Sequence, residues 1–133
     1  TDFADGLDDA TGTPDNDTRL QAAVLGAAPI DLRRFPPNRT FDRFLGATLD
    51  ERPDVYAMAS PITFVTPDDP PMFLYHGVSD WMVDVSQSRL MLEALHNAGV
   101  PAAYHETGGG HFATFLFDDG QIAKAIDFLD RWL

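Results

Sequence analysis

Cysteine is absent from this chain of 133 residues, and long apolar runs are absent as well. Without cysteine the chain has no disulfide framework, no thiolate nucleophile and no thiolate metal ligand, and the cellular compartment stays open. No apolar run approaches the roughly 20 residues that span a bilayer, so we expect no membrane span. The sequence begins at Thr1, with neither an initiator methionine nor a signal-peptide pattern. We therefore expect that a segment was removed upstream or that the chain is a product of cleavage.

Positive charge is scarce. Nine lysine and arginine residues stand against 21 aspartate and glutamate residues, which gives a formal net charge of −12, and Lys124 is the only lysine. This balance excludes an electrostatic nucleic-acid binder, because phosphate contacts need clustered basic residues, and it argues against docking on anionic membranes. The four histidines show no metal-ligand spacing, so we expect neither a metal nor another cofactor. A hydrophobic content of 44% is enough for the packed core of one domain.

Strand and helix patterns alternate along the sequence. Residues 1–18 are rich in Asp, Gly and Thr and predict an exposed acidic loop. Short apolar runs predict strands at 21–28, 72–75 and 102–106. Residues 31–58 predict an irregular segment with short helical patches, which would cover the rim of the sheet and shape a substrate pocket.

Capping and breaking residues place the helices. Within 31–58 we expect Thr40 to cap one short helix and Pro53 to begin another. Asp84, with Gln87 three residues on, resembles a capping box for a longer helix that ends at Gly99. The apolar face expected on this helix consists of Val85, Met91, Leu92, Leu95 and Ala98. A last helix is expected to present an apolar face of Ile122, Ala125, Ile126, Leu129 and Leu133.

Strands that alternate with helices at this spacing imply right-handed crossovers between parallel strands. The predicted fold class is therefore α/β, with about three parallel strands and flanking helices. Three parallel strands make a poor free-standing sheet, because the first would expose an unpaired apolar edge. We expect the strand at 21–28 to need a neighbour that this chain does not supply.

Two residues with catalytic potential follow the second and third predicted strands. Asp80 comes just after the strand at 72–75, and His111 comes after the strand at 102–106 and the glycines 108–110. The carboxyl ends of parallel strands share one rim of the sheet, so both side chains are expected there. An imidazole oriented by a carboxylate activates a hydroxyl nucleophile, which would make His111 the general base and then acid, and Asp80 its partner. The glycines would let the chain turn tightly and bring His111 to the rim.

Other residues compete for these roles. His105 is the one serious rival to His111, but it falls inside a predicted strand, where the pleat sets its direction. We expect His76 to have a structural role at the strand end, bonding to neighbouring backbone, and His96 to be solvated. Ser79 adjoins Asp80 but lacks the sharp glycine-flanked turn of a hydrolase nucleophile.

Several motifs in one register resemble the C-terminal half of microbial α/β-hydrolase esterases. They are Ala59-Ser60-Pro61-Ile62, His76-Gly77 with Asp80 and Val83, Gln87-Ser88, Leu95, Ala98-Gly99-Val100 and Gly110-His111. The likeness covers roughly residues 20–133 and is to the esterase/lipase and feruloyl-esterase-like group, with the prolyl-oligopeptidase-type peptidases further off. In that family the Asp of H-G-x-x-D and the His of G-x-G-H are triad members, which implies these roles for Asp80 and His111. Asp84 departs from the family, which often has proline there.

The family's serine nucleophile is missing from this sequence. An α/β-hydrolase carries it in a G-x-S-x-G turn ahead of the Asp and the His. The chain has four serines, and none is flanked by glycine two residues away on both sides: Ser60, Ser79, Ser86 and Ser88. We therefore interpret residues 1–133 as the C-terminal portion of one α/β-hydrolase domain, which needs further strands from a missing N-terminal part.

The resemblance implies a serine hydrolase of carboxylic esters, carboxylesterase- or lipase-like, that works by Ser-Asp-His acyl transfer. This chain would supply Asp80 and His111 and be inactive alone. Its partners would be a small-molecule ester and the N-terminal half of the same hydrolase, which would carry the serine. Trp81, Met82 and Phe112 flank the predicted site and are candidate substrate contacts, although packing at the core or rim explains them equally well. Two alternatives stay open, a prolyl-oligopeptidase-type serine peptidase and a non-catalytic hydrolase-like binding module.

Overall fold

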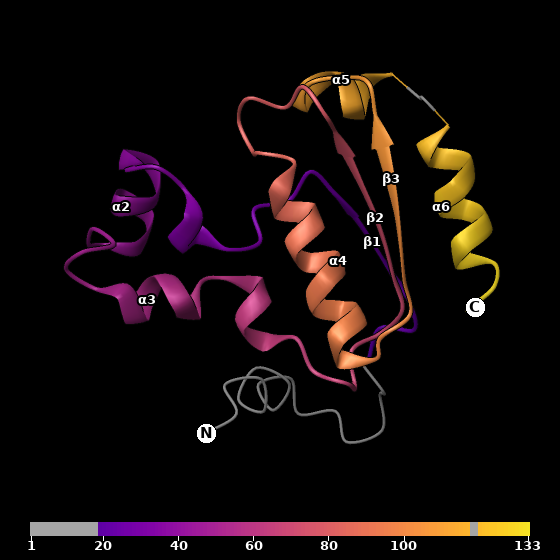
Figure 1. Ribbon diagram of the computed structural model, residues 1–133, viewed down its shortest axis with the longest axis horizontal. Coiled ribbons are helices and arrows are strands. Elements are labelled where there is room, and N and C mark those ends of the chain that lie inside the picture. The colour runs from indigo at the N-terminus through magenta and orange to yellow at the C-terminus, as the bar shows by residue number, and fades with distance from the viewer. Residues whose placement is uncertain (1–18, 118–119) are drawn as a thin grey trace, which may run out of the picture.

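A parallel sheet of three strands forms the centre of the structure, a computed structural model that describes residues 19–117 and 120–133 (Figure 1). The strands are β1 (Ala23–Gly26), β2 (Met72–Gly77) and β3 (Ala102–Thr107), in the order β1-β2-β3. Both pairings are parallel, which confirms the predicted α/β class. β1 is shorter than predicted at both ends, whereas β2 runs two residues beyond its predicted end. The acidic loop predicted at 1–18 lies outside the described residues.

The middle strand β2 is buried on both of its faces, which explains its unbroken apolar pattern. Leu74 is fully buried on one face, in the main core. Phe73 is buried on the other face, where its ring centroid lies 5.9 Å from that of Phe128. The main core consists of Ile30, Leu74, Met91, Leu95 and Val100.

Two helices cover opposite faces of the sheet, α4 (Ser86–Ala98) and α6 (Gln121–Leu129) (Figure 1). α4 ends at Gly99, as predicted, with a left-handed φ of 79°. The predicted capping box does not form, because the residue at the N-cap is Val85 and not Asp84. Asp84 Oδ1 accepts a hydrogen bond of 2.9 Å from Ser86 N–H, but the Gln87 side chain turns to the chain after β1 instead of back to Asp84.

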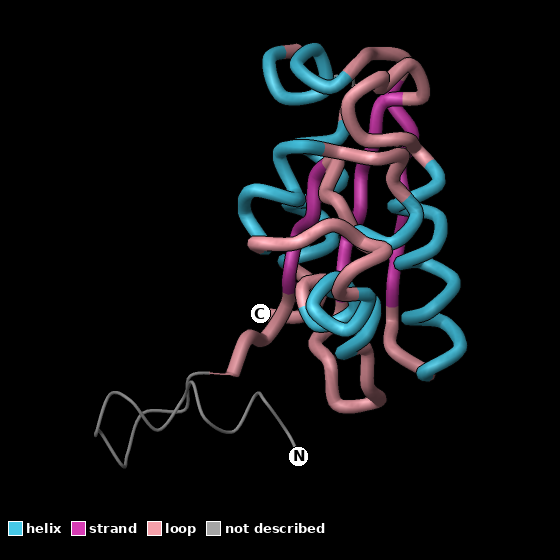
Figure 2. The backbone as a smooth tube through the Cα atoms, turned by 90° about the vertical axis from the view of Figure 1, so that its left-hand side faces the viewer, coloured by secondary structure: helices cyan, strands magenta, loops and turns pink. Residues whose placement is uncertain are grey.

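Four short helices connect β1 to β2, and Figure 2 shows this connection lying in front of the sheet. They are η2 (Leu32–Arg34), α2 (Arg39–Leu45), α3 (Pro53–Met58) and η3 (Pro61–Phe64), and α3 begins at Pro53 as predicted. The prediction that Thr40 caps α2 is wrong. Asn38 is the cap, because its side-chain oxygen reaches the N–H groups of both Thr40 (2.9 Å) and Phe41 (3.4 Å).

α6 leaves much of its apolar side uncovered. Phe128 is buried against β2, but Ile126 on the predicted apolar face is 52% exposed. β1 pairs with β2 along one edge, and no described residue pairs with its other edge. No helix in the described ranges has the length and apolar character needed to cross a membrane. The open edge of β1 and the apolar side of α6 are therefore the surfaces through which further protein would attach.

We expect the 133-residue chain alone to self-associate through these surfaces. Ile126→Lys should weaken the association, because it places a charge on the apolar side of α6. The added lysine also moves the net charge of −12 toward zero, and this change alone would strengthen self-association. Weaker self-association of Ile126→Lys would therefore identify the lost apolar contact as the cause. Ala123→Lys adds the same charge at an exposed position of the same helix and is the control. Sedimentation velocity measures the result, and a monomeric wild-type chain would contradict the expectation.

Candidate active site

Asp80 lies in the loop that follows β2, at the carboxyl end of the sheet, and its side chain is completely buried. Its Oδ1 accepts hydrogen bonds from the backbone N–H groups of Met82 and Val83, each 2.9 Å long. This local turn is one that aspartate forms readily, because the carboxylate takes the place of a backbone carbonyl. The second oxygen, Oδ2, is left to face the end of β3.

His111 is the first residue of α5 (His111–Leu116), and its Nδ1 lies 2.7 Å from Asp80 Oδ2. The structure therefore brings together the two predicted site residues, which are 31 positions apart. An ionised carboxylate only accepts hydrogen bonds, so Nδ1 carries the proton and Nε2 presents a lone pair. No group in residues 19–117 or 120–133 hydrogen-bonds to Nε2, and the His111 side chain is 19% exposed. That nitrogen is available to accept a proton from an incoming hydroxyl.

Two phenylalanine rings hold the imidazole from the sides. The rings of Phe112 and Phe115 meet that of His111 edge to face, with centroids 5.6 Å and 5.4 Å away. Together with the bond to Asp80, these contacts restrict rotation of the ring about its side-chain torsions.

The loops that carry Asp80 and His111 are bonded to each other through the backbone. Val78 N–H donates to Thr107 O (2.9 Å), and Ser79 N–H donates to Gly109 O (3.2 Å). A Cβ on Gly77 would lie 2.1 Å from Gly109 O, so only glycine permits this approach. His111 does lie at the rim, as expected, but none of the residues 108–110 has a positive φ, so the turn does not depend on the conformational freedom of glycine. Gly109 is required for space instead, since its Cβ would lie 2.8 Å from that of Ala113.

The electrostatic state of Asp80 follows from its hydrogen bonds. Burial is the largest single influence on this carboxyl and by itself would raise its pKa. The hydrogen bonds from Val83 N–H, His111 and Met82 N–H together outweigh burial, and the pKa of Asp80 lies below its ordinary value of 3.8. Asp80 is therefore ionised at neutral pH and able to stabilise a positive charge on His111.

The remaining histidines lie elsewhere or contact other groups. Nδ1 of His105 is 2.9 Å from Lys124 Nζ on α6, so this rival to His111 does not reach Asp80. Nε2 of His96 lies 3.2 Å from Ala102 O at the far end of α4. His76 is completely buried, and its Nε2 contacts the backbone oxygen of Val83 at 2.8 Å, as the sequence analysis expected. Its second contact, from Nδ1 to Ser88 Oγ, was not anticipated.

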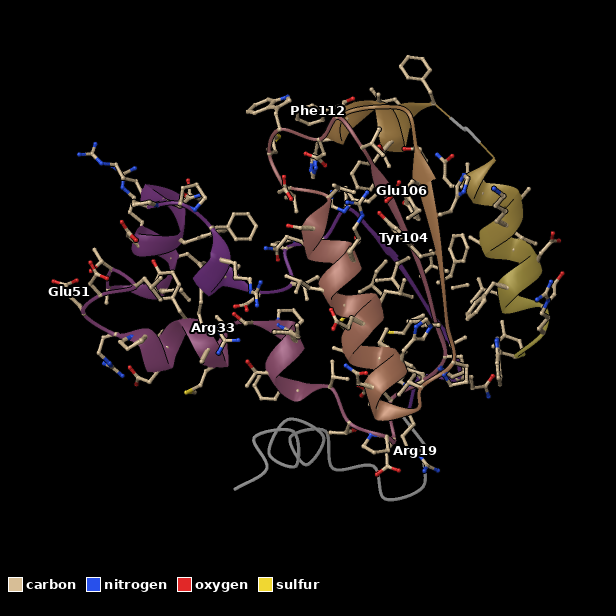
Figure 3. All side chains as sticks on the ribbon, viewed as in Figure 1. Arg19, Arg33, Glu51, Tyr104, Glu106 and Phe112 are labelled. Atoms are coloured by element: carbon tan, nitrogen blue, oxygen red, sulfur yellow. The ribbon has the colours of Figure 1, made fainter. Side chains whose placement is uncertain are left out.

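The three candidate substrate contacts do not line one pocket in the described part of the chain. Trp81 and Met82 line a groove of about 570 Å³, whose opposite wall is the segment from Arg34 to Asn38. Trp81 is 80% exposed there. Phe112 lies outside this groove, and Figure 3 shows it at the end of the molecule toward which β2 and β3 point.

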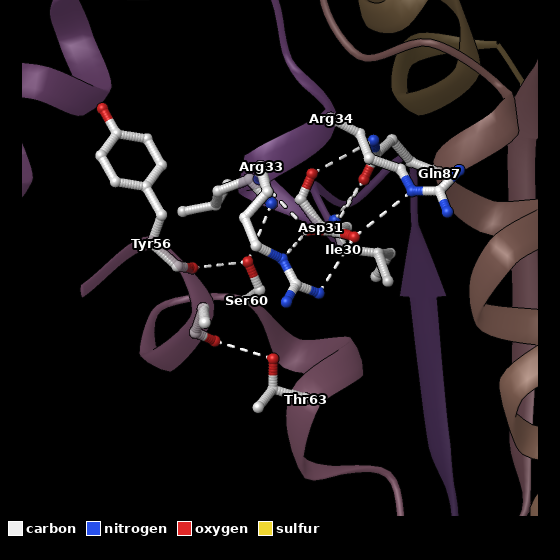
Figure 4. Close-up of polar contacts among 10 residues, drawn as sticks. Ile30, Asp31, Arg33, Arg34, Tyr56, Ser60, Thr63 and Gln87 are labelled. Carbon is white, nitrogen blue, oxygen red and sulfur yellow. Dashed lines mark hydrogen bonds and ion pairs between the residues drawn. The ribbon is translucent and has the colours of Figure 1, made fainter. Parts of the chain in front are cut away.

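A buried polar network supports the chain that leads into the groove wall, and no sequence pattern predicted it (Figure 4). Gln87 Oε1 accepts hydrogen bonds from the N–H groups of Ile30 (2.9 Å) and Asp31 (2.7 Å). Ser60 Oγ accepts from Leu32 N–H (2.9 Å) and donates to Tyr56 O (2.7 Å). These bonds tie η2 to α4 and α3. Ser60 is completely buried and has a structural role here.

Among the residues that the structure describes, no group of three or more His, Asp or Glu side chains is arranged to hold a metal ion. The functional groups that the described residues bring together at this site are the imidazole of His111 and the carboxylate of Asp80. None of the four serine hydroxyls in the described ranges hydrogen-bonds to His111. Ser79 in particular is exposed and makes its bond to the histidine loop only through its backbone.

Comparison with known proteins identifies the family. The family model described as BD-FAE matches residues 3–95, which is more than half of the chain. The chain belongs to the BD-FAE family. Its resemblance to the α/β-hydrolase esterases, expected from the sequence motifs, is confirmed.

Relatives of this BD-FAE chain include two curated esterases of Mycobacterium tuberculosis (strain ATCC 25618 / H37Rv). Esterase LipQ is 39% identical over 84 residues, which are 59% of this chain and 20% of LipQ. Esterase LipC is 34% identical over 122 residues, which are 84% of this chain and 30% of LipC. The chain therefore spans less than a third of the length of either relative.

The fold matches a solved structure of a truncated form of carbohydrate esterase from gut microbiota, with a TM-score of 0.78 and 29% identity. The match covers 85% of this chain and 42% of the esterase. The three-stranded sheet and its helices are thus part of an α/β-hydrolase fold.

Gly77→Ala should separate the loops that carry Asp80 and His111, because the added methyl group collides with Gly109 O. We expect a loss of unfolding free energy of about 3 kcal/mol. Gly108→Ala is the control, since a Cβ there meets nothing within 4 Å and Gly108 has no positive φ. Urea unfolding measures both variants, and equal stabilities would show that the close approach is not required.

The lowered pKa of Asp80 predicts a contribution to acid stability. Above pH 3.8 the carboxyl is ionised in both the folded and the unfolded protein, and its hydrogen bonds contribute fully to stability. Below pH 3.8 the unfolded protein binds the proton first, so this contribution is lost as pH falls through the lower folded-state pKa. Asp80→Asn should therefore show a shallower loss of stability on acidification than the wild type. Urea unfolding between pH 5 and pH 2 tests this, and parallel profiles would contradict it.

Proposed function

We propose that this chain is the C-terminal portion, residues 1–133, of one α/β-hydrolase domain that hydrolyses carboxylic esters through a serine nucleophile. The observation that carries the proposal is the 2.7 Å contact between Asp80 Oδ2 and His111 Nδ1 in a member of the BD-FAE family. Asp80 and His111 are the catalytic residues of this chain. The serine and the oxyanion donors belong to the N-terminal half of the same hydrolase, which is the partner of this chain.

The proposed reaction begins when His111 Nε2 takes the proton of the serine hydroxyl, and the serine oxygen attacks the ester carbonyl carbon. Asp80 remains ionised and stabilises the imidazolium. His111 then gives the proton to the departing alcohol, which leaves an acyl-serine. Water attacks the acyl-serine by the same route, with His111 as base and then acid, and releases the carboxylic acid and the free serine.

The substrate is placed on the rim formed by the loop after β2 and by α5. Phe112 lies beside His111, where its exposed ring would contact the group closest to the scissile bond. Trp81 and Met82 line the groove that leads away from Asp80 toward Arg34, and would contact a more distant part of the substrate. The names of LipQ, LipC and the carbohydrate esterase all describe ester hydrolysis, which favours an ester over a peptide substrate.

His111→Ala should abolish hydrolysis of p-nitrophenyl acetate by the complete enzyme, with kcat lowered by about 10³-fold or more. Asp80→Asn should be nearly as damaging, because an amide in place of the carboxylate no longer fixes the His111 tautomer. His96→Ala is the control, since this exposed histidine of α4 lies away from the site. Kinetics at saturating substrate measure the losses, and full activity of His111→Ala would refute the assignment.

The same preparation tests the location of the nucleophile. Intact mass spectrometry after inactivation by an organophosphate should place the added mass on a segment that carries a G-x-S-x-G turn and not on residues 1–133. Labelling of any serine of this chain would contradict the proposed division of the triad.

A further inference from the structure

His76 is the one buried ionisable side chain at the site that the proposed reaction leaves without a task. It lies on β2, one residue before the chain leaves the sheet, and no part of its side chain is exposed. Its Nε2 lies 2.8 Å from Val83 O and 3.3 Å from Asp80 Oδ2. Its Nδ1 lies 2.8 Å from Ser88 Oγ, in the first turn of α4.

These partners determine where the proton of His76 resides. Val83 O is a carbonyl oxygen and Asp80 is ionised, so both can only accept a hydrogen bond. Nε2 must therefore carry a proton, and the Ser88 hydroxyl is the hydrogen-bond partner of Nδ1. The ring is hydrogen-bonded at both nitrogens, in keeping with the lack of any unsatisfied buried side-chain atom among the described residues.

We propose that His76 is a positioning residue for the catalytic pair, a role that rests on the function proposed above. Its Nε2–H donates to Val83 O, and the same nitrogen lies 3.3 Å from the carboxylate oxygen that His111 binds, so Oδ2 of Asp80 lies between two imidazoles at 2.7 Å and 3.3 Å. His76 limits rotation of the carboxylate and, through Val83 O, holds the end of the turn that donates to Oδ1. It thereby sets the direction from which Asp80 meets His111 Nδ1.

The geometry distinguishes this role from simple packing. A residue that only filled space would affect folding and leave the His111–Asp80 hydrogen bond unchanged. A second imidazole 3.3 Å from Oδ2 changes the electrostatic potential at the oxygen that accepts the hydrogen bond from His111 Nδ1–H. The effect is largest on the positively charged His111 that forms in the proposed reaction, so it appears in kcat and not in KM.

Two substitutions at position 76 separate the functions of the ring nitrogens. His76→Asn places its amide near the position of Nδ1 and removes both the donor to Val83 O and the ring nitrogen beside Asp80 Oδ2. His76→Gln reaches the position of Nε2 and keeps that donor. In the complete enzyme labelled with ¹⁵N-histidine, His76 of the wild type should show a protonated Nε2 and a bare Nδ1, and His111 Nδ1–H should give a low-field proton resonance.

We expect His76→Asn to move this His111 resonance and to lower kcat for p-nitrophenyl acetate by about tenfold or more at unchanged KM. His76→Gln should restore both toward wild type. The inference is overturned by an unmoved resonance in folded His76→Asn, by a His76→Gln variant no better than His76→Asn, or by a proton on Nδ1 of His76. If His76→Asn does not fold, Ser88→Ala tests the inference, since loss of the bond to Nδ1 leaves the ring held only at Nε2 and should move the His111 resonance in the same direction by a smaller amount. An unmoved resonance in Ser88→Ala would then overturn the inference.

Failure of the proposed function gives a different result. A wild-type enzyme that lacks the low-field resonance, or that remains active as His111→Ala, contradicts the catalytic assignment of the pair. An enzyme that passes both checks but does not respond at position 76 contradicts only the role of His76.

Discussion

The buried carboxylate of Asp80 is the constraint on which the geometry of the site depends. It receives hydrogen bonds from two backbone N–H groups of its own loop and from His111, which lies on a different element. An isolated buried charge would be strongly destabilising, so the three donors must be in place for the loop to close at all. The conformation of residues 80–83 and the position of α5 are therefore coupled through one side chain. A site built in this way is ordered before substrate arrives, which is what electrostatic stabilisation of a transient charge requires.

The first turn of α4 connects this site to the groove beside it. Gln87 and Ser88 are adjacent in sequence, yet they point to different partners. Gln87 accepts hydrogen bonds from the backbone of Ile30 and Asp31, which precede the groove wall at Arg34, and Ser88 bonds to His76 beside Asp80. Both side chains are almost completely buried. Because they share a single helical turn, a displacement of α4 would move the groove wall and the support of Asp80 together.

Much of this arrangement could be predicted from local sequence patterns. Apolar runs and glycine stops located all three strands and the end of α4, and the position of Asp80 and His111 after parallel strands indicated that they would meet. The contacts that the sequence did not predict join distant positions. The Gln87 side chain bonds to Ile30 and Asp31, which lie 57 and 56 positions earlier in the chain. The residues next to Gln87 in the sequence do not distinguish these bonds from the predicted hydrogen bond to Asp84. The close approach of Gly77 to Gly109 likewise depends on two loops meeting, so the sequence analysis explained Gly109 by turn conformation although the reason for glycine at that position is space.

The two edges of the described sheet differ in a way that indicates where the rest of the domain attaches. β3 carries polar and charged side chains, which pair with neighbouring helices: Glu106 bonds to Arg89, and His105 contacts Lys124. Such an edge is suited to solvent. β1 consists of Ala23–Gly26, small and apolar residues typical of a strand with neighbours on both sides. Further strands would therefore extend the sheet beyond β1, and a nucleophile at the carboxyl end of the next strand would share the rim with Asp80 and His111.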